Sequence, residues 1–235
     1  MLKVKDLEVG YDGATVLHRL NMEVGKGQVV CVMGRNGVGK TTLLKTLMGL
    51  LRPTHGTIEF DGADMTRTTP DKRARAGLGY VPQGRDIFPH LSVEENLELG
   101  LEATVSANGK RAEKLPDIIW DSFPMLGKML TRRGGQLSGG QQQQLAIGRA
   151  LATQPQILIL DEPMEGIQPS VVQDIEHFIE SLKKKREIAV LLVEQSVDFA
   201  TKVADYSYVM DKGAIVAQGG PNELSEEVLR GHLTV

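Results

Sequence analysis

The segment GRNGVGKTT at residues 34–42 has the composition and spacing of a phosphate-binding loop. Its glycines let the backbone turn so that successive N–H groups face an anion, and a helix after the loop directs its positive end to the same point. The apolar run VVCV at 29–32 predicts a strand before the loop, and the pattern at 41–51 predicts a helix after it. Lys40 can then reach the outer phosphates of a nucleotide, and the Thr41 hydroxyl can bind Mg²⁺. The segment matches the pattern G-x-x-x-x-G-K-T through Gly34, Gly39, Lys40 and Thr41.

Two carboxylates follow a second apolar run, ILIL at 157–160. A continuous apolar run of this length fits a strand buried on both faces of a parallel sheet, so its end lies beside the phosphate-binding loop. Asp161 is therefore placed to hold the metal ion. Glu162 comes next and points a different way, so it can polarise a water molecule for attack on the terminal phosphate.

A second glycine-rich helix start lies in LSGGQQQQLAIGRAL, residues 137–151. Ser138 is a good N-cap, and Gly139 and Gly140 expose the backbone N–H groups of the first turn, so this end can also bind an anion. One nucleotide cannot easily use both ends within one chain, because the first loop already wraps its phosphates. The pattern predicts two chains that face each other, each lending its 137–141 segment to the phosphates held by the other. Such a dimer would close on ATP and open after hydrolysis.

The elements that position these residues form an α/β pattern. Residues 1–30 alternate as β structure, AVLLV at 189–193 is a third buried strand, and helical patterns cover 141–152 and 171–185. The part from about 88 to 150 is predicted as a helical insert that carries LSGGQ. It opens with Ser92 and Glu95, the spacing of a capping box. Near the end, a hairpin with Gly213 in its turn precedes a short helix capped by Ser225.

Length, charge and cysteine content narrow the class of protein. The 235 residues carry a formal net charge of −3, which supplies no overall basic field for nucleic acid. The only cysteine, Cys31, lies in an apolar run and is expected to be buried, which fits a reducing compartment. The first residues do not resemble a signal peptide, and no apolar stretch of about 18 residues could span a membrane. Work at a membrane would therefore require a partner that spans it.

Taken together, GRNGVGKTT, LSGGQ and LDEP at these spacings resemble the ATPase subunits of the ATP-binding-cassette (ABC) family over essentially the whole chain. The resemblance implies an α/β fold of P-loop NTPase type, with an N-terminal antiparallel β subdomain at about 1–30 and 55–62. The whole of 1–235 would be one ABC ATPase domain. It also implies ATP and Mg²⁺ as cofactors.

The resemblance assigns further residues. Tyr11 stands where the family stacks an aromatic ring on adenine, and Gln83 in GYVPQ stands at the loop that links the metal site to the helical insert. The catalytic set becomes Glu162, Gln195 and Gln83, and the metal set Thr41, Gln83 and Asp161. The nucleotide-binding set consists of Tyr11, Gly34, Arg35, Asn36, Gly37, Val38, Gly39, Lys40, Thr41, Thr42, Ser138, Gly139, Gly140 and Gln141.

Two positions depart from the common family pattern. Gln195 stands where most members have a histidine, and an amide can donate a hydrogen bond but cannot carry charge or shuttle a proton. Pro169 stands where most members place an aspartate, which weakens the expected inter-subunit contact from that loop. Both departures recur in the branch that resembles branched-chain amino acid and urea importers. Within it, QQQQ and EGIQPS most resemble the urea-transporter subunit, with a branched-chain amino acid importer as the alternative.

That branch implies partners and a location. The subunit would sit on the cytoplasmic face of the inner or plasma membrane against transmembrane permease subunits, and a solute-binding protein would act indirectly. A heterodimer with a second ATPase subunit is expected in the cell, and a homodimer can form in isolation. A small-molecule kinase would not explain LSGGQ, and chromosome or repair ATPases need a long coiled-coil insert that residues 84–136 cannot hold.

Several other features are interpreted as structural, and for some of them a functional role is the alternative. Trp120 and Phe123 are read as local core, with a docking groove for a permease helix as the alternative. The four glutamines at 141–144 are read as an exposed helical face. The five histidines show no metal-ligand spacing, and LKKKRE at 182–187 is read as a solvated helix end.

Overall fold

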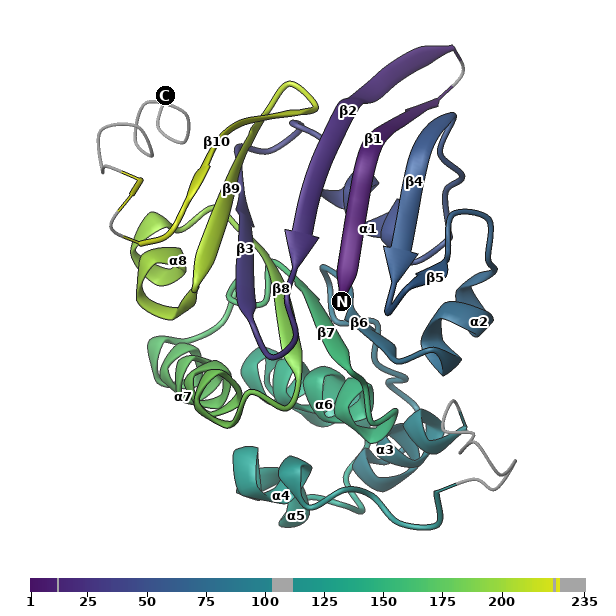
Figure 1. Cartoon of the computed structure of the whole chain (residues 1–235). Helices are drawn as coiled ribbons and strands as arrows, with labels where there is room; N and C mark the ends of the chain where they lie inside the picture. The colour runs from purple at the N-terminus through teal and green to yellow at the C-terminus, as the bar shows by residue number, and fades with distance from the viewer. Residues whose placement is uncertain (12, 103–111, 222, 225–235) are drawn as a thin grey trace.

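The computed structural model describes residues 1–11, 13–102, 112–221 and 223–224, and these form two sheets with helices around them (Figure 1). The larger sheet has the strand order β10-β9-β3-β8-β7-β6. Neighbours from β9 to β6 run parallel, and β10 is antiparallel to β9. The strands are β3 (Val29–Met33), β6 (Leu78–Val81), β7 (Ile157–Asp161), β8 (Ala189–Glu194), β9 (Tyr206–Asp211) and β10 (Ala214–Gly219).

The smaller sheet is antiparallel, as the family resemblance implied for the N-terminal part. Its order is β2-β1-β4-β5, and β1 pairs with both β2 and β4. Along β1, Leu2, Val4, Leu7 and Val9 are buried while the residues between them are more exposed, which is the alternation expected of a sheet with one covered face. The strands are β1 (Leu2–Tyr11), β2 (Ala14–Val24), β4 (His55–Phe60) and β5 (Ala63–Asp64).

Helix α1 (Lys40–Leu47) packs between the two sheets. Its Leu43, Leu44 and Leu47 are fully buried in a core shared with β1, β2 and one face of the larger sheet. Alternate residues of β3 divide between two cores, because Val30 and Val32 face α1 whereas Cys31 faces the opposite side. The buried strand ends therefore position side chains on both faces. Helix α2 (Pro70–Arg75) lies beside the smaller sheet (Figure 1).

The other face of the larger sheet is covered by the remaining helices, which share one core. As predicted, Ser92 and Glu95 form a capping box at α3. Phe123 is 1% exposed and packs 5.2 Å from Phe178 between ring centroids, so its reading as local core is confirmed. These helices are α3 (Val93–Leu101), α4 (Ile118–Ser122), α5 (Pro124–Gly127), the 3₁₀ turn η1 (Gly134–Gln136), α6 (Gly139–Ala152), α7 (Pro169–Lys185) and α8 (Val197–Val203).

Some boundaries differ from the sequence predictions. The helix expected over 41–51 ends at Leu47, because Gly49 adopts a positive φ of 75° and the chain turns there. The reading of 141–144 as an exposed face was wrong: Gln143 and Gln144 are 4% and 6% exposed, and Gln144 donates to Asp174 of α7 at 3.0 Å. Sequence reasoning also missed β6 as a strand. The helix predicted after Ser225 lies outside the described residues.

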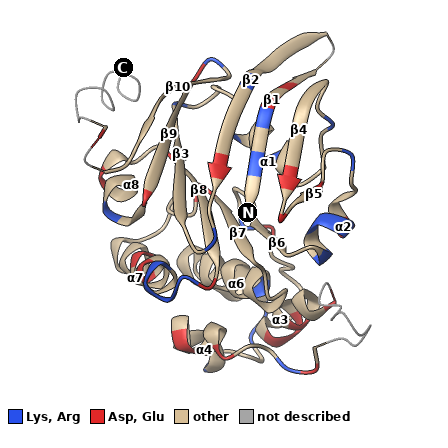
Figure 2. Cartoon of the chain, in the orientation of Figure 1, with Lys and Arg blue, Asp and Glu red and all other residues tan. Residues whose placement is uncertain are grey.

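Charge is spread rather than gathered over the described chain. Figure 2 shows lysine and arginine on α2, near the end of α7 and elsewhere, with acidic residues interspersed among them. Cys31 is fully buried, as expected, and burial raises the pKa of its thiol. Among the described helices, none has the length and apolar character needed to cross a membrane.

Candidate functional site

The residues singled out in the sequence gather where parallel strands end. The carboxyl ends of β3, β6, β7 and β8 point to the same edge of the larger sheet, which is where open α/β sheets bind ligands. The loop 34–42 follows β3, Gln83 follows β6, Glu162 follows β7 and Gln195 follows β8. Four segments far apart in the sequence thus converge on one site.

The phosphate-binding loop leads directly into α1. Gly39 is the N-cap of this helix and has a φ of 108°, and a side chain there would approach Leu17 and Met210 to about 3 Å. Only glycine therefore fits this position without strain. The Lys40 ammonium lies in the loop, where it donates to the carbonyls of Gly34 at 2.7 Å and Arg35 at 3.0 Å.

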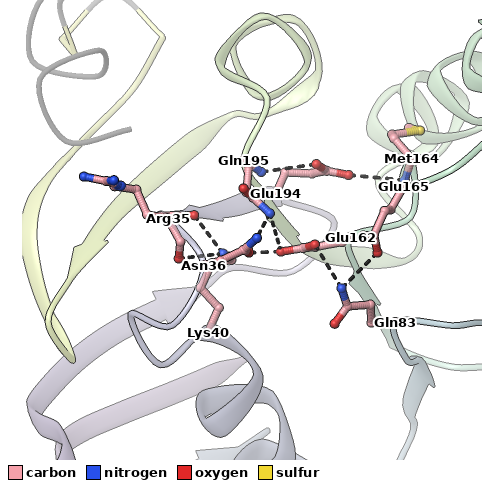
Figure 3. A network of polar contacts seen from close by, with 10 residues as sticks. Arg35, Asn36, Lys40, Gln83, Glu162, Met164, Glu165, Glu194 and Gln195 are labelled. Carbon is pink, nitrogen blue, oxygen red and sulfur yellow. Dashed lines mark hydrogen bonds and ion pairs between the residues drawn. The ribbon is translucent and has the colours of Figure 1, made fainter. Parts of the chain in front are cut away.

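The Glu162 carboxylate is the meeting point of the site (Figure 3). Its Oε1 forms an ion pair with Lys40 Nζ at 3.3 Å, and the two side chains are only 9% and 5% exposed. The same oxygen accepts a hydrogen bond from the Gln195 amide at 3.0 Å, and that amide also donates to Asn36 Oδ1 at 2.7 Å. A buried carboxylate is tolerated because these partners compensate its charge and its lone pairs.

Gln83 reaches the other oxygen of Glu162. Its amide nitrogen donates to Glu162 Oε2 at 3.3 Å and to Glu165 at 2.9 Å. Both contacts use the nitrogen, so the amide oxygen is the atom of Gln83 suited to act as a metal ligand (Figure 3). The backbone of the loop after Gln83 is strained, because the non-glycine residues Arg85 and Asp86 have φ values of 74° and 46°.

Two further carboxylates lie at the strand ends with raised pKa values. Burial, with the adjacent charge of Glu162, raises the pKa of Asp161 to about 6, and Tyr80 donates to it at 3.5 Å. Burial raises the pKa of Glu194 to about 7 against the backbone hydrogen bonds that lower it. Asp161 was expected from the sequence. Glu194 was missed, although it also ends a buried apolar strand, which was the signal available.

The remaining nucleotide-binding candidates lie around this center. Tyr11 is 42% exposed, and its hydroxyl lies 3.5 Å from the Thr42 hydroxyl, which places the ring beside the first turn of α1. Thr41 is exposed on that turn, and Arg35, Asn36 and Gly37 are exposed in the loop, whereas Val38 is buried. Tyr11 and Thr41 make no hydrogen bond with Glu162 within the described part of the chain.

The LSGGQ segment forms the start of α6 as predicted. Ser138 and Gln141 make a reciprocal capping box, with Gln141 N donating to Ser138 Oγ at 3.3 Å and Ser138 N donating to Gln141 Oε1 at 3.0 Å. Gly140 lies so close to Val171 that a Cβ would come within 2.6 Å of it. The Arg85 guanidinium approaches Gly139, and a Cβ there would lie 3.2 Å from Nη1. Among the described residues no hydrogen bond joins Ser138 or Gln141 to the loop 34–42.

Sequence comparison identifies the family. A family model described as ABC transporter matches residues 17–165, which is more than half of the chain. The chain belongs to the ABC transporter family. A relative from Pseudomonas aeruginosa, the high-affinity branched-chain amino acid transport ATP-binding protein BraG, is 38% identical over 92% of this chain and 91% of its own. A probable branched-chain amino acid transport protein, LivF of Archaeoglobus fulgidus, is 34% identical over 96% and 94%.

Other members of the family are nearly as similar. The lipopolysaccharide export ATP-binding protein LptB of Haemophilus influenzae is 32% identical over 99% of this chain and 97% of its own. A solved ATP-binding subunit of an ABC transporter superposes with a TM-score of 0.85 at 26% identity, with both chains fully covered. An ATP-binding cassette of an ABC transporter superposes with a TM-score of 0.80 at 30% identity, over 97% of this chain and 94% of its own. The predicted fold class is confirmed, and the chain is an ABC-type ATPase.

Proposed function

We propose that this chain hydrolyses MgATP with Glu162 as the residue that polarises the attacking water, and so powers a solute importer. The observation that carries the proposal is the set of contacts on one carboxylate. Lys40, Gln83 and Gln195 come from three different strand ends and reach Glu162 at 3.3, 3.3 and 3.0 Å. A carboxylate held in this way beside a phosphate-binding loop supports a role in polarising the water that attacks a terminal phosphate.

The loop 34–42 supplies the phosphate contacts. Lys40 is anchored on the carbonyls of Gly34 and Arg35, so its ammonium stays in the loop and offers its charge to the outer phosphates. The exposed Tyr11 ring stacks on adenine beside α1. The backbone N–H groups at the start of α1 face the phosphates. The other contributors are Asn36, Gly37, Val38, Gly39 and Thr42.

The candidate metal donors fit Mg²⁺. They are the Thr41 hydroxyl, the Gln83 amide oxygen and the Asp161 carboxylate, which are hard oxygen donors from the loop and two strand ends. Three protein oxygens leave room in an octahedral shell for the waters and phosphate oxygens that Mg²⁺ usually keeps as ligands. When bound, Mg²⁺ would neutralise charge that develops on the phosphate oxygens.

Gln195 orients the attacking group and the phosphate. It donates to both Glu162 and Asn36, so it links the carboxylate to the phosphate loop. Since a neutral amide does not transfer a proton at physiological pH, Gln195 contributes through hydrogen bonding alone. The α6 start, with Ser138, Gly139, Gly140 and Gln141, contacts the terminal phosphate bound by a facing subunit. That arrangement forms a sandwich dimer, which can be a homodimer in isolation and a heterodimer in the cell.

The subunit acts on the cytoplasmic face of the membrane against permease subunits. The proposed solute is urea, for which the motifs GYVPQGR, LSGGQQQQ and EGIQPS argue by resemblance. A branched-chain amino acid is the second candidate, and the transport proteins BraG and LivF, at 38% and 34% identity, favour it. No residue of the ATPase site touches the solute, so transport measurements must decide between them.

Steady-state hydrolysis by purified variants tests the ATPase assignment. Glu162→Gln and Lys40→Ala should each lower kcat at least about a hundredfold, on the scale of losing a general base or a phosphate-binding charge. Glu8→Gln, which makes the same change on the smaller sheet, should keep the wild-type rate. In gel filtration with ATP, Glu162→Gln should elute as a dimer and Lys40→Ala as a monomer. Wild-type kcat in Glu162→Gln would refute the proposal.

Uptake measurements test the solute. Cells that lack this protein would be complemented with wild type or with Glu162→Gln and given labelled urea or labelled leucine. Recovery of urea uptake by wild type alone supports urea, and recovery of leucine uptake instead supports the second candidate. No recovery of either, with normal expression and ATPase activity, would contradict both solute assignments.

A further inference from the structure

Glu194 is a buried carboxylate with no role in the proposed mechanism so far. It ends β8 after five apolar residues and is 5% exposed. A carboxylate at such a depth is costly unless its oxygens accept hydrogen bonds. The fold keeps it nonetheless, one residue before Gln195.

Its two oxygens accept from two different loops (Figure 3). Oε1 accepts from the backbone N–H of Met164 at 3.3 Å, and Oε2 accepts from the backbone N–H of Gln195 at 3.2 Å. Met164 belongs to the loop that starts at Glu162, whereas Gln195 starts the loop after β8. A single side chain therefore holds the backbones of both loops.

Those loops carry the two side chains that meet over the phosphate loop. Gln195 Nε2 lies 3.0 Å from Glu162 Oε1, and this distance depends on how the two backbones are spaced. A second backbone link, from Glu162 N to Val193 O at 2.9 Å, fixes only the start of the first loop. The Glu194 contact lies two residues further along, where the chain turns away from β7.

We infer that Glu194 is a positioning residue for ATP hydrolysis, which sets the Glu162 and Gln195 side chains relative to each other by holding the backbones of both loops. The inference rests on the roles proposed above for Glu162 and Gln195. It assigns no contact between Glu194 and the nucleotide.

The chemistry of the carboxylate explains why this residue type is used. An ionised carboxylate offers acceptors on both oxygens, so it can satisfy two N–H donors at once. A glutamine has the same shape but one acceptor and one donor, and its NH₂ group would face one of the two backbone N–H groups.

The principal test compares Glu194→Gln with wild type in steady-state hydrolysis and in binding of a fluorescent ATP analogue. We expect kcat to fall about tenfold to a hundredfold, since a displacement of about 1 Å in reacting groups has such an effect. The dissociation constant for the analogue should change less than about threefold, because the contacts of Lys40 with Gly34 and Arg35 do not involve Glu194. Wild-type kcat in Glu194→Gln, with the variant folded, would overturn the inference.

Asp205→Asn is the matched control. Asp205 also accepts a backbone N–H, from Val29 at 2.9 Å, but at the start of β9 and thus at the opposite edge of the sheet. The Asp205→Asn variant should lower Tm, but it should not lower kcat selectively while nucleotide affinity stays unchanged. If Asp205→Asn lowers kcat as much as Glu194→Gln at equal loss of Tm, Glu194 acts through stability alone and the inference fails.

A double variant separates this inference from the proposed function. In Glu162→Gln the reaction no longer uses the Glu162 carboxylate, so adding Glu194→Gln should reduce the residual rate by less than twofold. If Glu194→Gln lowers kcat by the same factor in the wild-type and Glu162→Gln backgrounds, the inference fails, although Glu162 can still be catalytic. Unchanged kcat in Glu162→Gln alone would refute the proposed function instead.

If Glu194→Gln does not fold, Glu194→Asp replaces it in the test, since it keeps both acceptor oxygens on a shorter side chain. Glu194→Asp should lower kcat in the same way but to a smaller degree, and a wild-type kcat in this variant would overturn the inference.

Discussion

Arg73 offers a direct test of the energetics of this fold. It lies in α2, and its side chain is 1% exposed although it carries a full charge. Its guanidinium donates to the carbonyls of Thr46 and Leu47, both at 2.7 Å, in the last turn of α1. The same group donates to carbonyls in the segment before α2, those of Met65, Thr66 and Thr68.

We expect Arg73→Met to destabilise the fold by roughly 3–5 kcal/mol. Each buried carbonyl left without a partner costs about 1–3 kcal/mol, and the desolvation of the guanidinium offsets part of the gain in the wild type. For a chain of this size, that loss corresponds to a fall in Tm of about 6–20 °C. Arg73→Lys, whose ammonium has fewer donors and no planar fork, should have a free energy of unfolding between those of wild type and Arg73→Met.

Thermal unfolding followed by circular dichroism, with urea unfolding for the free energy, measures the effect. The control is Arg75→Met in the same helix, because the Arg75 side chain is 59% exposed and pairs with Asp71 at 3.9 Å. That change should stay within about 0.5 kcal/mol of wild type. If Arg73→Met also stays within about 1 kcal/mol, the carbonyls at the end of α1 do not depend on Arg73 and the reasoning is wrong.

Three further outcomes are expected. Because the pKa of Glu194 rises from 4.5 to about 7 on folding, the native state binds more protons than the unfolded chain between those values, and Tm should fall as pH rises from about 5 to 8. The charge of Glu162 also raises the pKa of Glu194, and the raised pKa of Asp161 lowers Tm with pH in the same direction, so Glu194→Gln should remove only part of the fall in Tm between pH 5 and 8. An unchanged fall in Tm with pH would contradict the raised pKa of Glu194. Gly100→Ala in α3 should cost about 1–3 kcal/mol by urea unfolding, since its Cβ would lie 2.4 Å from Arg149 O. Gly127→Ala should be neutral, because its Cβ would lie at an ordinary contact distance of 3.7 Å from Trp120. Tyr11→Ala should raise the KM for ATP about fivefold to a hundredfold with little change in kcat, and Tyr11→Phe should match wild type; equal KM values for all three would exclude stacking.

The sequence sufficed for features that depend on local pattern. The runs at 29–32, 157–160 and 189–193 are buried strands because continuous apolar residues have no solvent face to offer. The capping box at Ser92 was predicted because the spacing of its two members is fixed by one helical turn, and Ser138 was predicted as an N-cap from its residue type.

Features that depend on long-range contacts were not accessible in this way. Gln143 and Gln144 are buried because α6 is covered on several sides, which no local periodicity in a polar run reveals. The role of Arg73 depends on carbonyls 26 and 27 residues away. The contact of Gln83 with Glu162 joins residues 79 apart, and its geometry follows from strand order in the sheet rather than from either motif.

The backbone at Glu162 has a consequence for how this protein can evolve. Glu162 has a φ of 46°, a left-handed conformation that costs a residue with a Cβ on the order of 1 kcal/mol. Asparagine or glycine would fit that conformation better, so the substitution that relaxes the backbone also removes the carboxylate. The same substitution would also leave the buried Lys40 ammonium, 3.3 Å from the Glu162 carboxylate, without its ion-pair partner, which costs more than the relaxed backbone gains. The contacts of the carboxylate thus hold the strained backbone at Glu162 in place, and stabilising substitutions must be sought elsewhere in the chain.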